Sequence, residues 1–391
     1  MAEPVLVALL LVFGGLLWFV YDGYLRCLRI VRHLMKPAAQ VDQVVGSVDG
    51  PPLEVAVLIT VHDEAHQIVE RLRNVLDQEF SGGRVEVVLA SDGSTDDLAA
   101  VVAEHSGGDV RIVHSEEKVG KSSIQNEAMA SISADVVVFS DADTRFAPGF
   151  LQAVVAPFAD ASVGAVQAHL LFGGGESGSL AASQGRYWRA ELAIRQLEAS
   201  FGILAVASGA CVAVRRTLWC PLAPTVGDDC MIPLDVVAQG YRVAYARDAV
   251  AHEPADDEFH RVIANRTRMT VRNWQGTWSR SELLDVFSHP GYAFALWSHK
   301  VLRWLSPVWL VGFAICSLAL PFASSGPLAW LPASAMGAVA LAAVVGWVGV
   351  SRSVKIPVCG SIYAFALANV GFAGGLIEAV RGRRISSYQS R

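Results

Sequence analysis

The chain has 391 residues, which is enough for one large domain or two of ordinary size. It is 53% hydrophobic and only 17% charged, whereas soluble domains carry about a quarter charged residues, so the composition predicts a membrane component. The net charge of −6 and the lack of a dense lysine–arginine block exclude nucleic acid as an expected partner. The six cysteines form no CxxC pair and no zinc-type cluster, so reduced thiols are expected rather than disulfides.

The first apolar run lies near the N-terminus. Residues 4–21 include no charged side chain, and at about 1.5 Å per residue they nearly span a ~30 Å hydrocarbon core. Four basic residues follow: Arg26, Arg29, Arg32 and Lys36. Because positive flanks stay cytoplasmic, residues 1–36 are expected to be a membrane anchor with a basic cytoplasmic flank and an outer N-terminus.

Between residues 37 and 280 the pattern changes to alternating strands and helices. Apolar runs at 55–61, 85–90, 110–114 and 136–140 predict buried strands, and the segments between them predict helices, among them 97–105 and 121–132. Such alternation predicts an α/β domain with a mostly parallel sheet and helices on both faces. Ligands of these sheets bind at the carboxyl ends of the strands.

Polar residues stand at those ends. The first strand is followed by Thr60, His62, Asp63 and Glu64, the second by Asp92, and the fourth by Asp141 and Asp143. Carboxylates are rarely buried unless they are paired or bound to metal. The two aspartates of "DADT" either form an Asx-type turn or hold a divalent cation, since Mg²⁺ uses one or two carboxylates with substrate phosphates.

Three further motifs carry charge. "VGKSS" (119–123) resembles the end of a P-loop, but position 115 is serine where that motif needs glycine, so only a lysine at a helix start, Lys121, is retained as a phosphate contact. "GDD" (227–229) begins a helix with two carboxylates, one more than capping requires, and one of them could act as a general base. In "NRTRMTVRNW", the arginines 266, 268 and 272 form either a solvated basic face or a diphosphate clamp.

The C-terminal third is apolar. The run 304–351 includes no charged residue and no histidine, and "SSGP" (324–327) can turn between two crossings; a third uncharged run covers 356–377. Three crossings here would leave Arg381, Arg383 and Arg384 outside, against the charge rule, so one of the three segments is expected to be re-entrant or interfacial. Residues 303–391 are therefore expected to hold two or three membrane segments and a short basic tail.

Taken in order, the motifs resemble the membrane-bound members of glycosyltransferase family 2, which are inverting enzymes with a GT-A fold. The resemblance covers about residues 53–275 and is carried by "VAVLITVHDE", "LASDGSTDD", "VGKSSIQNEA", "VVVFSDADTRFAPGF", "SGACVAVRR" and "GDDCMIPLDVVAQGYRV". It implies a Rossmann-like catalytic domain between N- and C-terminal transmembrane helices. The segment "HPGYAFALWSHKVLRWLSP" (289–307) resembles the interfacial helix of such enzymes, and we place an interfacial amphipathic segment at 281–302.

The resemblance also implies a donor site. His62 and Asp63 stand where the family usually has tyrosine and asparagine. Lys121 would approach the nucleotide, Asp141 the ribose side, and Asp143 with Asp141 a divalent metal, Mg²⁺ or Mn²⁺, on the diphosphate. The nucleotide-sugar contacts implied in this way are Thr60, His62, Glu64, Asp92, Lys121, Asp141, Arg266 and Arg268.

For catalysis, Asp229 matches the family's base, which deprotonates the acceptor hydroxyl as that oxygen attacks the anomeric carbon. Asp228 would cap the helix or orient its neighbour. The metal and Arg268 would stabilise the departing nucleoside diphosphate.

The implied activity is hexosyl transfer from a nucleotide sugar, expected to be a UDP-sugar, to a lipid-linked or glycan acceptor at the bilayer. Processive members carry a Gln-x-x-Arg-Trp signature, but here Asn265 and Met269 take the places of Gln and Trp. We therefore favour single-sugar transfer over a processive polysaccharide synthase of the cellulose or hyaluronan type, and product length separates the two. An inactive membrane scaffold is the third alternative, which sugar-nucleotide turnover would exclude. The expected location is the plasma (inner) membrane, multi-pass, with a cytoplasmic catalytic domain.

Overall fold

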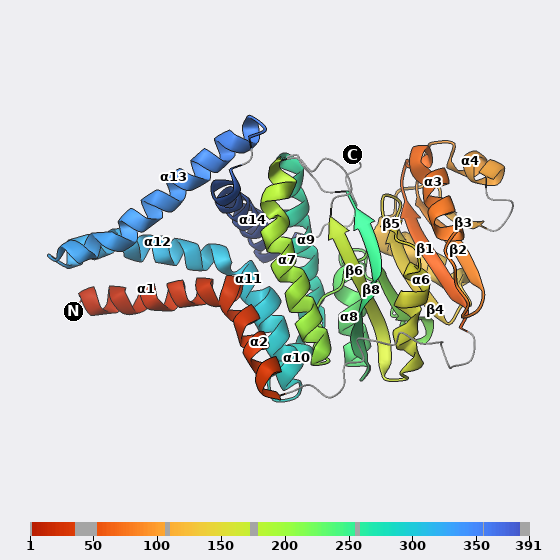
Figure 1. The fold of residues 1–391 in the computed structure, drawn as a ribbon, viewed down its shortest axis with the longest axis horizontal. Helices are drawn as coiled ribbons and strands as arrows, with labels where there is room; N and C mark the ends of the chain where they lie inside the picture. Colours follow the sequence, from red (N-terminus) through yellow and green to blue (C-terminus); the bar gives the residue numbers. More distant parts are fainter. Residues whose placement is uncertain are drawn as a thin grey trace.

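The computed structural model describes residues 2–35, 53–105, 110–172, 179–254, 259–354 and 356–383, with the side chains of 179–187 and 259–261 excepted. Lys36 and Arg384, named above, lie outside these ranges. Figure 1 shows three parts that follow one another from left to right: a bundle of long helices that carries the N-terminus, a group of helices lying across the base of this bundle, and a sheet domain.

The sheet domain is built on eight strands in the order β3-β2-β1-β4-β7-β6-β8-β5. Their bounds are β1 Val55–Val61, β2 Val85–Asp92, β3 Val110–Ser115, β4 Val136–Asp141, β5 Arg145–Phe146, β6 Val163–Phe172, β7 Val212–Arg215 and β8 Arg242–Glu253. The pairs within β1 to β4 and the β6–β8 pair are parallel, whereas β7 is antiparallel to both its neighbours and β5 to β8. The prediction of a mostly parallel α/β sheet is confirmed.

Helices cover both faces of this sheet. On one face pack α3 (Ala65–Leu76), α4 (Leu98–His105) and α6 (Phe150–Val155), and on the other α5 (Lys121–Ser131) and α8 (Asp228–Ala238). In β1, Val57 packs with the helices of the first face and Leu58 with those of the second, and both side chains are fully buried. This strand is therefore a continuous apolar run in the sequence. The register sets Thr60 beside Ala90 and Asp141, so the polar strand ends meet at one edge.

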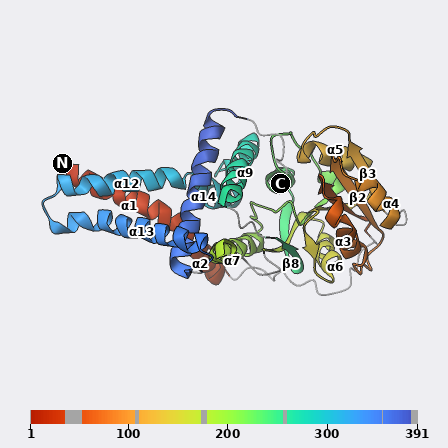
Figure 2. The same cartoon turned by 90° about the horizontal axis from the view of Figure 1, so that it is seen from above.

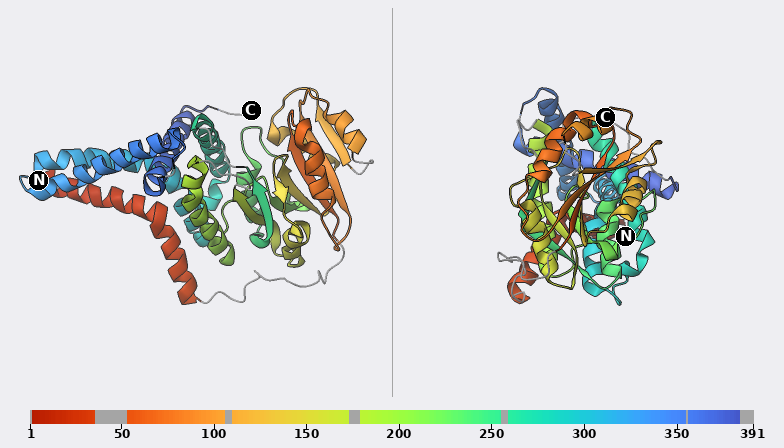
Figure 3. Two further views of the ribbon diagram at one scale, coloured as in Figure 1. Left: turned by 45° about the horizontal axis from the view of Figure 1, so that its top comes forward. Right: turned by 90° about the vertical axis from the view of Figure 1, so that its right-hand side faces the viewer.

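The helices beside the sheet domain form an interface layer (Figures 1 and 3). Its members are α2 (Tyr24–Met35), α7 (Ser179–Ser200), α9 (Phe259–Ser279), a 3₁₀ turn (Ser281–Leu284), α10 (Pro290–Ala295), a π-helical segment (Leu296–Val301), α11 (Leu302–Trp304) and α14 (Pro357–Val380). Of these, α14 packs along α9 and also contacts α7, while α2 contacts α7. The segment predicted to be interfacial, 281–302, falls in this layer.

The bundle consists of α1 (Ala2–Trp18), α12 (Ser306–Ala323) and α13 (Leu331–Ser351), which run along one another in Figure 2. Within the described ranges, four segments are long and apolar enough to cross a membrane: Ala2–Met35, Ser306–Ala323, Pro327–Ser351 and Pro357–Val380. Between α1 and α2 the chain passes through a π-helical segment, Phe19–Gly23, and bends away from the bundle (Figure 1), and π-bulges are an established cause of such kinks.

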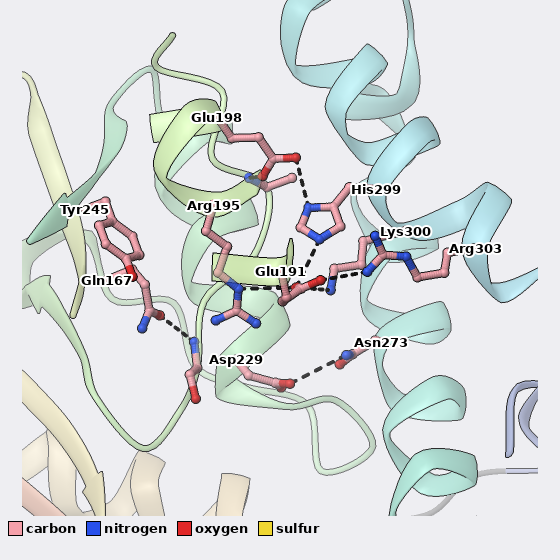
Figure 4. Close-up of polar contacts among 12 residues, drawn as sticks. Gln167, Glu191, Arg195, Glu198, Asp229, Tyr245, Asn273, His299, Lys300 and Arg303 are labelled. Atoms are coloured by element: carbon pink, nitrogen blue, oxygen red, sulfur yellow. Dashed lines mark hydrogen bonds and ion pairs between the residues drawn. The ribbon is translucent and has the colours of Figure 1, made fainter. Parts of the chain in front are cut away.

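A buried ionic group, the Glu191 cluster, joins α7 to the segment 299–303 (Figure 4). Glu191 lies 2.6 Å from Arg303 Nη1, 3.0 Å from His299 Nε2 and 3.3 Å from Arg195 Nε. His299 Nδ1 faces Glu198 at 2.9 Å, so both ring nitrogens of this buried side chain meet carboxylate oxygens, which accept hydrogen bonds. Burial alone would raise the pKa of Glu191, but His299, Lys300 and Arg303 hold that pKa well below its usual range.

Replacing Glu191 by Gln is expected to lower the free energy of unfolding by about 3–5 kcal/mol, because it leaves buried cations without their counter-charge. The matched control is Glu378→Gln, which removes a 3.0 Å pair with Arg383, a side chain that is 69% exposed, and such pairs contribute about 0–1 kcal/mol. Thermal unfolding of both variants in detergent measures the difference. Equal melting temperatures for the two variants would show that the Glu191 cluster does not hold the helices of the interface layer together.

Candidate active site

The first two strand-end loops are tied to each other and to the start of α5. Asp92 is buried, and its Oδ1 accepts hydrogen bonds from the backbone N–H groups of Val119 (2.7 Å) and Gly120 (2.8 Å). His62 Nδ1 lies 2.6 Å from the Asp92 carbonyl oxygen. Asp63 adopts φ +54° and accepts a 2.7 Å bond from Thr95 N–H, and this left-handed conformation suits Asp or Asn better than most residues.

Lys121 connects the two acidic motifs. Its Nζ lies 2.7 Å from Asp141 Oδ1 and 3.3 Å from Asp228 Oδ2. One turn further along α5, Gln125 Nε2 donates to Asp228 Oδ2 at 2.8 Å and to Thr60 Oγ1 at 3.3 Å. Burial alone would lower the pKa of Lys121, but the two carboxylates outweigh burial and raise that pKa, so the amine stays charged. The strand ends and the start of α8 thus form one connected site.

Asp141 and Asp143 lie at the open side of this site. The Asp141 side chain is 32% exposed, and Asp143 is half-buried. Among the residues that the structure describes, no group of three or more His, Cys, Asp or Glu is placed to hold a metal ion. Hard divalent cations bind through one or two carboxylates completed by phosphate oxygens, so this pair fits an ion that binds together with a diphosphate.

Arg71 of α3 supports the strand that carries these carboxylates. It is fully buried, donates from Nη2 to Ser140 Oγ at 2.7 Å, and stacks 4.2 Å from the Phe146 ring centre. Burial lowers the pKa of Arg71 to about 9, helped by Arg145, while Asp141 and Asp143 oppose the shift. A buried cation of α3 therefore holds the end of β4 in place through Ser140.

Asp228 is buried inside the site. Its carboxylate accepts from Lys121, from Gln125 and from the backbone N–H of Asp229 at 3.0 Å. Gly209 backs it so closely that a Cβ there would lie 2.5 Å from Asp228 Oδ1. Burial would raise the pKa of Asp228, but Lys121 and Gln125 outweigh burial and lower it. Asp228 is thus an ionised group that holds its neighbour in place, which is more than a helix cap.

Asp229 has the opposite environment. It is partly exposed, and Asn273 Nδ2 of α9 lies 3.5 Å from its Oδ2. Burial and the charge of Asp228 raise the pKa of Asp229, against Arg272, Lys121 and Lys300. A carboxylate with a raised pKa in a reachable position suits a general base. Figure 4 shows Asp229 and Asn273 beside the Glu191 cluster, so this end of the site borders the interface layer.

The three arginines of the motif NRTRMTVRNW, which lies within α9 (Phe259–Ser279), have different surroundings. Arg272 Nη2 donates to Ser122 Oγ at 2.8 Å and to the Val226 carbonyl oxygen, which ties α9 to the site. Burial lowers the pKa of Arg272 and Asp229 opposes that shift, while the charge of Arg268, one turn earlier, lowers the pKa further. Arg266 instead packs toward α14, with its guanidinium 5.5 Å from the Phe372 ring centre. The structure therefore brings Arg272 into the site and sets Arg266 against α14.

The sequence-predicted residues Thr60, His62, Asp92, Lys121, Asp141, Asp228 and Asp229 are brought together by the contacts above, with Asp143 two residues from Asp141. Glu64 lies at the start of α3 and accepts from Gln67 at 3.1 Å. Three contributing residues were missed: Arg71, Gln125 and Asn273. Gln125 could have been found from its i+4 spacing to Lys121, whereas nothing local to Arg71 signals its contact with β4.

The comparison with protein families decides the class. The family described as "Glycosyltransferase like family 2" matches residues 51–271. The chain belongs to glycosyltransferase family 2. It is therefore a glycosyltransferase, as the ordered motifs predicted.

Curated relatives of this glycosyltransferase are similar over parts of their length. An N-acetylglucosaminyltransferase of Bradyrhizobium diazoefficiens is 25% identical over 242 residues, which are 58% of this chain and 48% of that protein. A poly-β-1,6-N-acetyl-D-glucosamine synthase of Staphylococcus aureus is 28% identical over 136 residues, 34% of this chain and 31% of that protein. The chain thus spans about half or less of the length of these relatives.

A solved structure is similar over the whole chain. It is the mannosyltransferase PcManGT from Pyrobaculum calidifontis in complex with GDP-Man and Mn²⁺, with a TM-score of 0.75 over 98% of this chain and 100% of that one. The sequence identity is 21%, so this likeness shows a shared fold and no more. The predicted GT-A fold with apolar helices at both ends is confirmed.

Proposed function

We propose that this glycosyltransferase moves a single sugar, with inversion, from a nucleotide sugar to a membrane-associated lipid-linked or glycan acceptor. The observation that carries the proposal is the Lys121 link: one ammonium spans Asp141 of the strand-end motif and Asp228 beside Asp229. Donor and base motifs are therefore held in one site. That site borders the interface layer through Asp229 and Asn273, which is where a membrane-bound acceptor would arrive.

Asp229 is the group proposed to take the acceptor proton. Its oxygen accepts the hydroxyl proton while the acceptor oxygen attacks the anomeric carbon, and the bond to the nucleoside diphosphate breaks on the opposite side. Asp228 stays ionised through Lys121 and Gln125, and its acceptance of the Asp229 N–H fixes the start of α8. Arg268, with Lys121 and the metal, is proposed to stabilise the negative charge on the leaving diphosphate, while Arg272 ties α9 to the site through Ser122.

A divalent metal, Mg²⁺ or Mn²⁺, is proposed to be held by Asp143 and Asp141 together with the donor diphosphate. When bound it would neutralise charge that develops on the leaving diphosphate. The half-exposed carboxylates and their oxygen-only chemistry support this assignment, and PcManGT, similar in fold, is described with GDP-Man and Mn²⁺. Lys121, paired with Asp141, is proposed to contact the nucleotide as well.

The donor site is proposed to use Thr60, His62, Glu64 and Asp92 for the nucleoside. The two curated relatives are named for N-acetylglucosamine, whereas PcManGT, which is similar in fold, is described with GDP-mannose. UDP-N-acetylglucosamine, as the UDP-sugar expected from the sequence, and GDP-mannose are therefore the donors to assay first.

Single transfer is favoured over polymerisation because the described membrane helices are few. Four candidate spans, of which only three form a bundle, leave little material for a polymer channel in one chain. Met269, where processive members have tryptophan, is 44% exposed.

Product length tests this proposal. Purified full-length chain with membrane lipid extract, Mn²⁺ and radiolabelled donor is expected to yield a product carrying one labelled sugar. A ladder of longer products would establish a polysaccharide synthase instead. Donor turnover of either kind would exclude an inactive scaffold.

The proposed location is the plasma (inner) membrane with a cytoplasmic catalytic domain. Arg26, Arg29 and Arg32 follow α1 in the described chain, and positive flanks stay cytoplasmic. Apolar spans stand before and after the sheet domain in the sequence, which supports a multi-pass arrangement.

A further inference from the structure

We propose that α14 lies in the plane of the cytoplasmic membrane interface alongside α9, so that the chain crosses the bilayer three times, through α1, α12 and α13. By length and apolarity α14 could have been a fourth crossing. In Figures 1 and 2 it instead lies across the direction of the bundle, with the helices of the interface layer. The inference rests on the proposed membrane insertion and is independent of the sugar transferred.

Contacts between α9 and α14 show that the two helices run side by side in the same direction. A Cβ on Gly371 would lie 2.6 Å from Arg266 Cβ, and one on Gly375 would lie 2.4 Å from Thr270 Cβ. Further on, Gln275 Nε2 donates to the Arg383 carbonyl oxygen at 2.9 Å. The contacts advance together along both helices, so α14 shares the side of the membrane on which α9 lies.

Helix α9 belongs to the catalytic side. It includes four arginines in its sequence, at 261, 266, 268 and 272, and charged side chains at a bilayer centre cost several kcal/mol (roughly 2.5–3.5 each on insertion scales). Its C-terminal half reaches into the active site, where Arg272 binds Ser122 and Asn273 faces Asp229. A helix fixed in this way cannot cross the bilayer, and neither can a partner packed along it.

The outer face of α14 fits lipid. Val358, Val370, Ile377 and Val380 are between 50% and 83% exposed, whereas Gly371 and Gly375 on the other side are buried against α9. Glu378 is the charged residue of this helix, and it pairs with Arg381 and Arg383 at the C-terminal end. An exposed aliphatic face on a helix attached to a cytoplasmic domain is the pattern of an interfacial helix.

One tryptophan of the same layer, Trp278 of α9, is exposed at 41%. Trp274 and Trp278 of α9 contact each other, Trp304 and Trp297 of the neighbouring segment, with ring centres 5.6 to 6.5 Å apart. Tryptophan is enriched where membrane meets water.

Three crossings also satisfy the charge rule that a third C-terminal crossing would break. With α14 in the plane, Arg381 and Arg383 stay on the side of Arg26, Arg29 and Arg32.

Accessibility of single added cysteines tests the topology in intact cells. A membrane-impermeant maleimide is expected to label Ser324→Cys, between α12 and α13, from outside. It is expected to label Arg381→Cys, after α14, only once the cells are lysed. Wild type gives the background, since its cysteines lie in the sheet domain, the interface layer or a buried position of α12. Labelling of Arg381→Cys from outside would mean that α14 crosses and would overturn the proposal.

The depth of α14 in the membrane is measured separately, because a re-entrant α14 would also leave Arg381 inside. A fluorophore on Val370→Cys, with the wild-type signal subtracted, is expected to be quenched more by lipids with a nitroxide near the head group than by lipids with one deep in the chain. Leu341→Cys, 65% exposed near the middle of α13, is expected to show the reverse order. Preferential deep quenching at Val370 would reject the in-plane position even if Arg381 stays inside.

Discussion

Replacing Asp229 by Asn is expected to lower kcat by at least ~100-fold, about 2.7 kcal/mol of barrier, while donor affinity stays close to that of the wild type. General-base catalysis typically contributes 10²–10⁴-fold, and Asn cannot accept the acceptor proton. The nucleoside contacts proposed above lie on β1, on the loop that follows it and on β2, and Lys121 and Asp141 lie on α5 and β4, so these contacts survive the change. Steady-state kinetics and calorimetric donor binding measure the two quantities.

Asp228→Asn is the matched variant, since it alters the adjacent carboxylate of the same helix start. The structure changes what to expect from it: Asp228 is a buried partner of Lys121 and Gln125, so its loss destabilises the fold by more than the ~1 kcal/mol of a helix cap. The main effect of Asp228→Asn is expected to be a lower melting temperature. An active Asp229→Asn enzyme together with a folded but dead Asp228→Asn enzyme would exchange the two roles.

The pH profile gives a second readout of the same base. Because burial and Asp228 raise the pKa of Asp229, and the base works only when deprotonated, the acidic limb of kcat/KM is expected above the ordinary aspartate pKa of about 3.9. Activity should fall as the pH drops through that raised value. In Asp228→Asn protein the neighbouring charge is gone, so the limb should move to lower pH.

Replacing Asp143 by Ala is expected to weaken Mn²⁺- or Mg²⁺-dependent donor binding by about 100-fold or more. Residues that only support a metal ligand typically cost 10–100-fold when changed, and Asp143 is proposed as a ligand itself. The fold should survive, because Asp143 lies in a half-exposed turn after β4. Calorimetry with the nucleotide sugar, with and without the metal, measures the loss.

Asp77→Ala is the control for that variant. Asp77 is an exposed aspartate at the C-terminal end of α3, away from the strand-end loops, and its loss should leave donor binding unchanged. Normal metal-dependent binding by Asp143→Ala protein would remove Asp143 from the metal site.

Much of the sheet domain could be predicted from local pattern. β1 and β4 are covered on both faces, so their sequences are continuous apolar runs, and the loops after them show their carboxylates directly. β7 is four residues long and antiparallel to both neighbours, and its sequence carried no comparable signal.

The interface layer could be predicted only in part. The basic flank and the segment 281–302 were visible as patterns, and the charge rule indicated that one C-terminal segment does not cross. The proposal that this segment is α14 rests on glycines of α14 that contact α9, and these contacts join residues about a hundred positions apart. The Glu191 cluster likewise joins Glu191 to His299 across 108 positions, and no local pattern encodes such a pairing.

The most direct test of the account is release of nucleoside diphosphate by the purified full-length chain, with membrane lipid extract and Mn²⁺, across a panel of UDP- and GDP-sugars. The account predicts release from at least one donor, and predicts that the release is lost on metal chelation and in Asp229→Asn protein but retained in Asp77→Ala protein. No release from any donor, or release that persists after chelation and in Asp229→Asn protein, would contradict it.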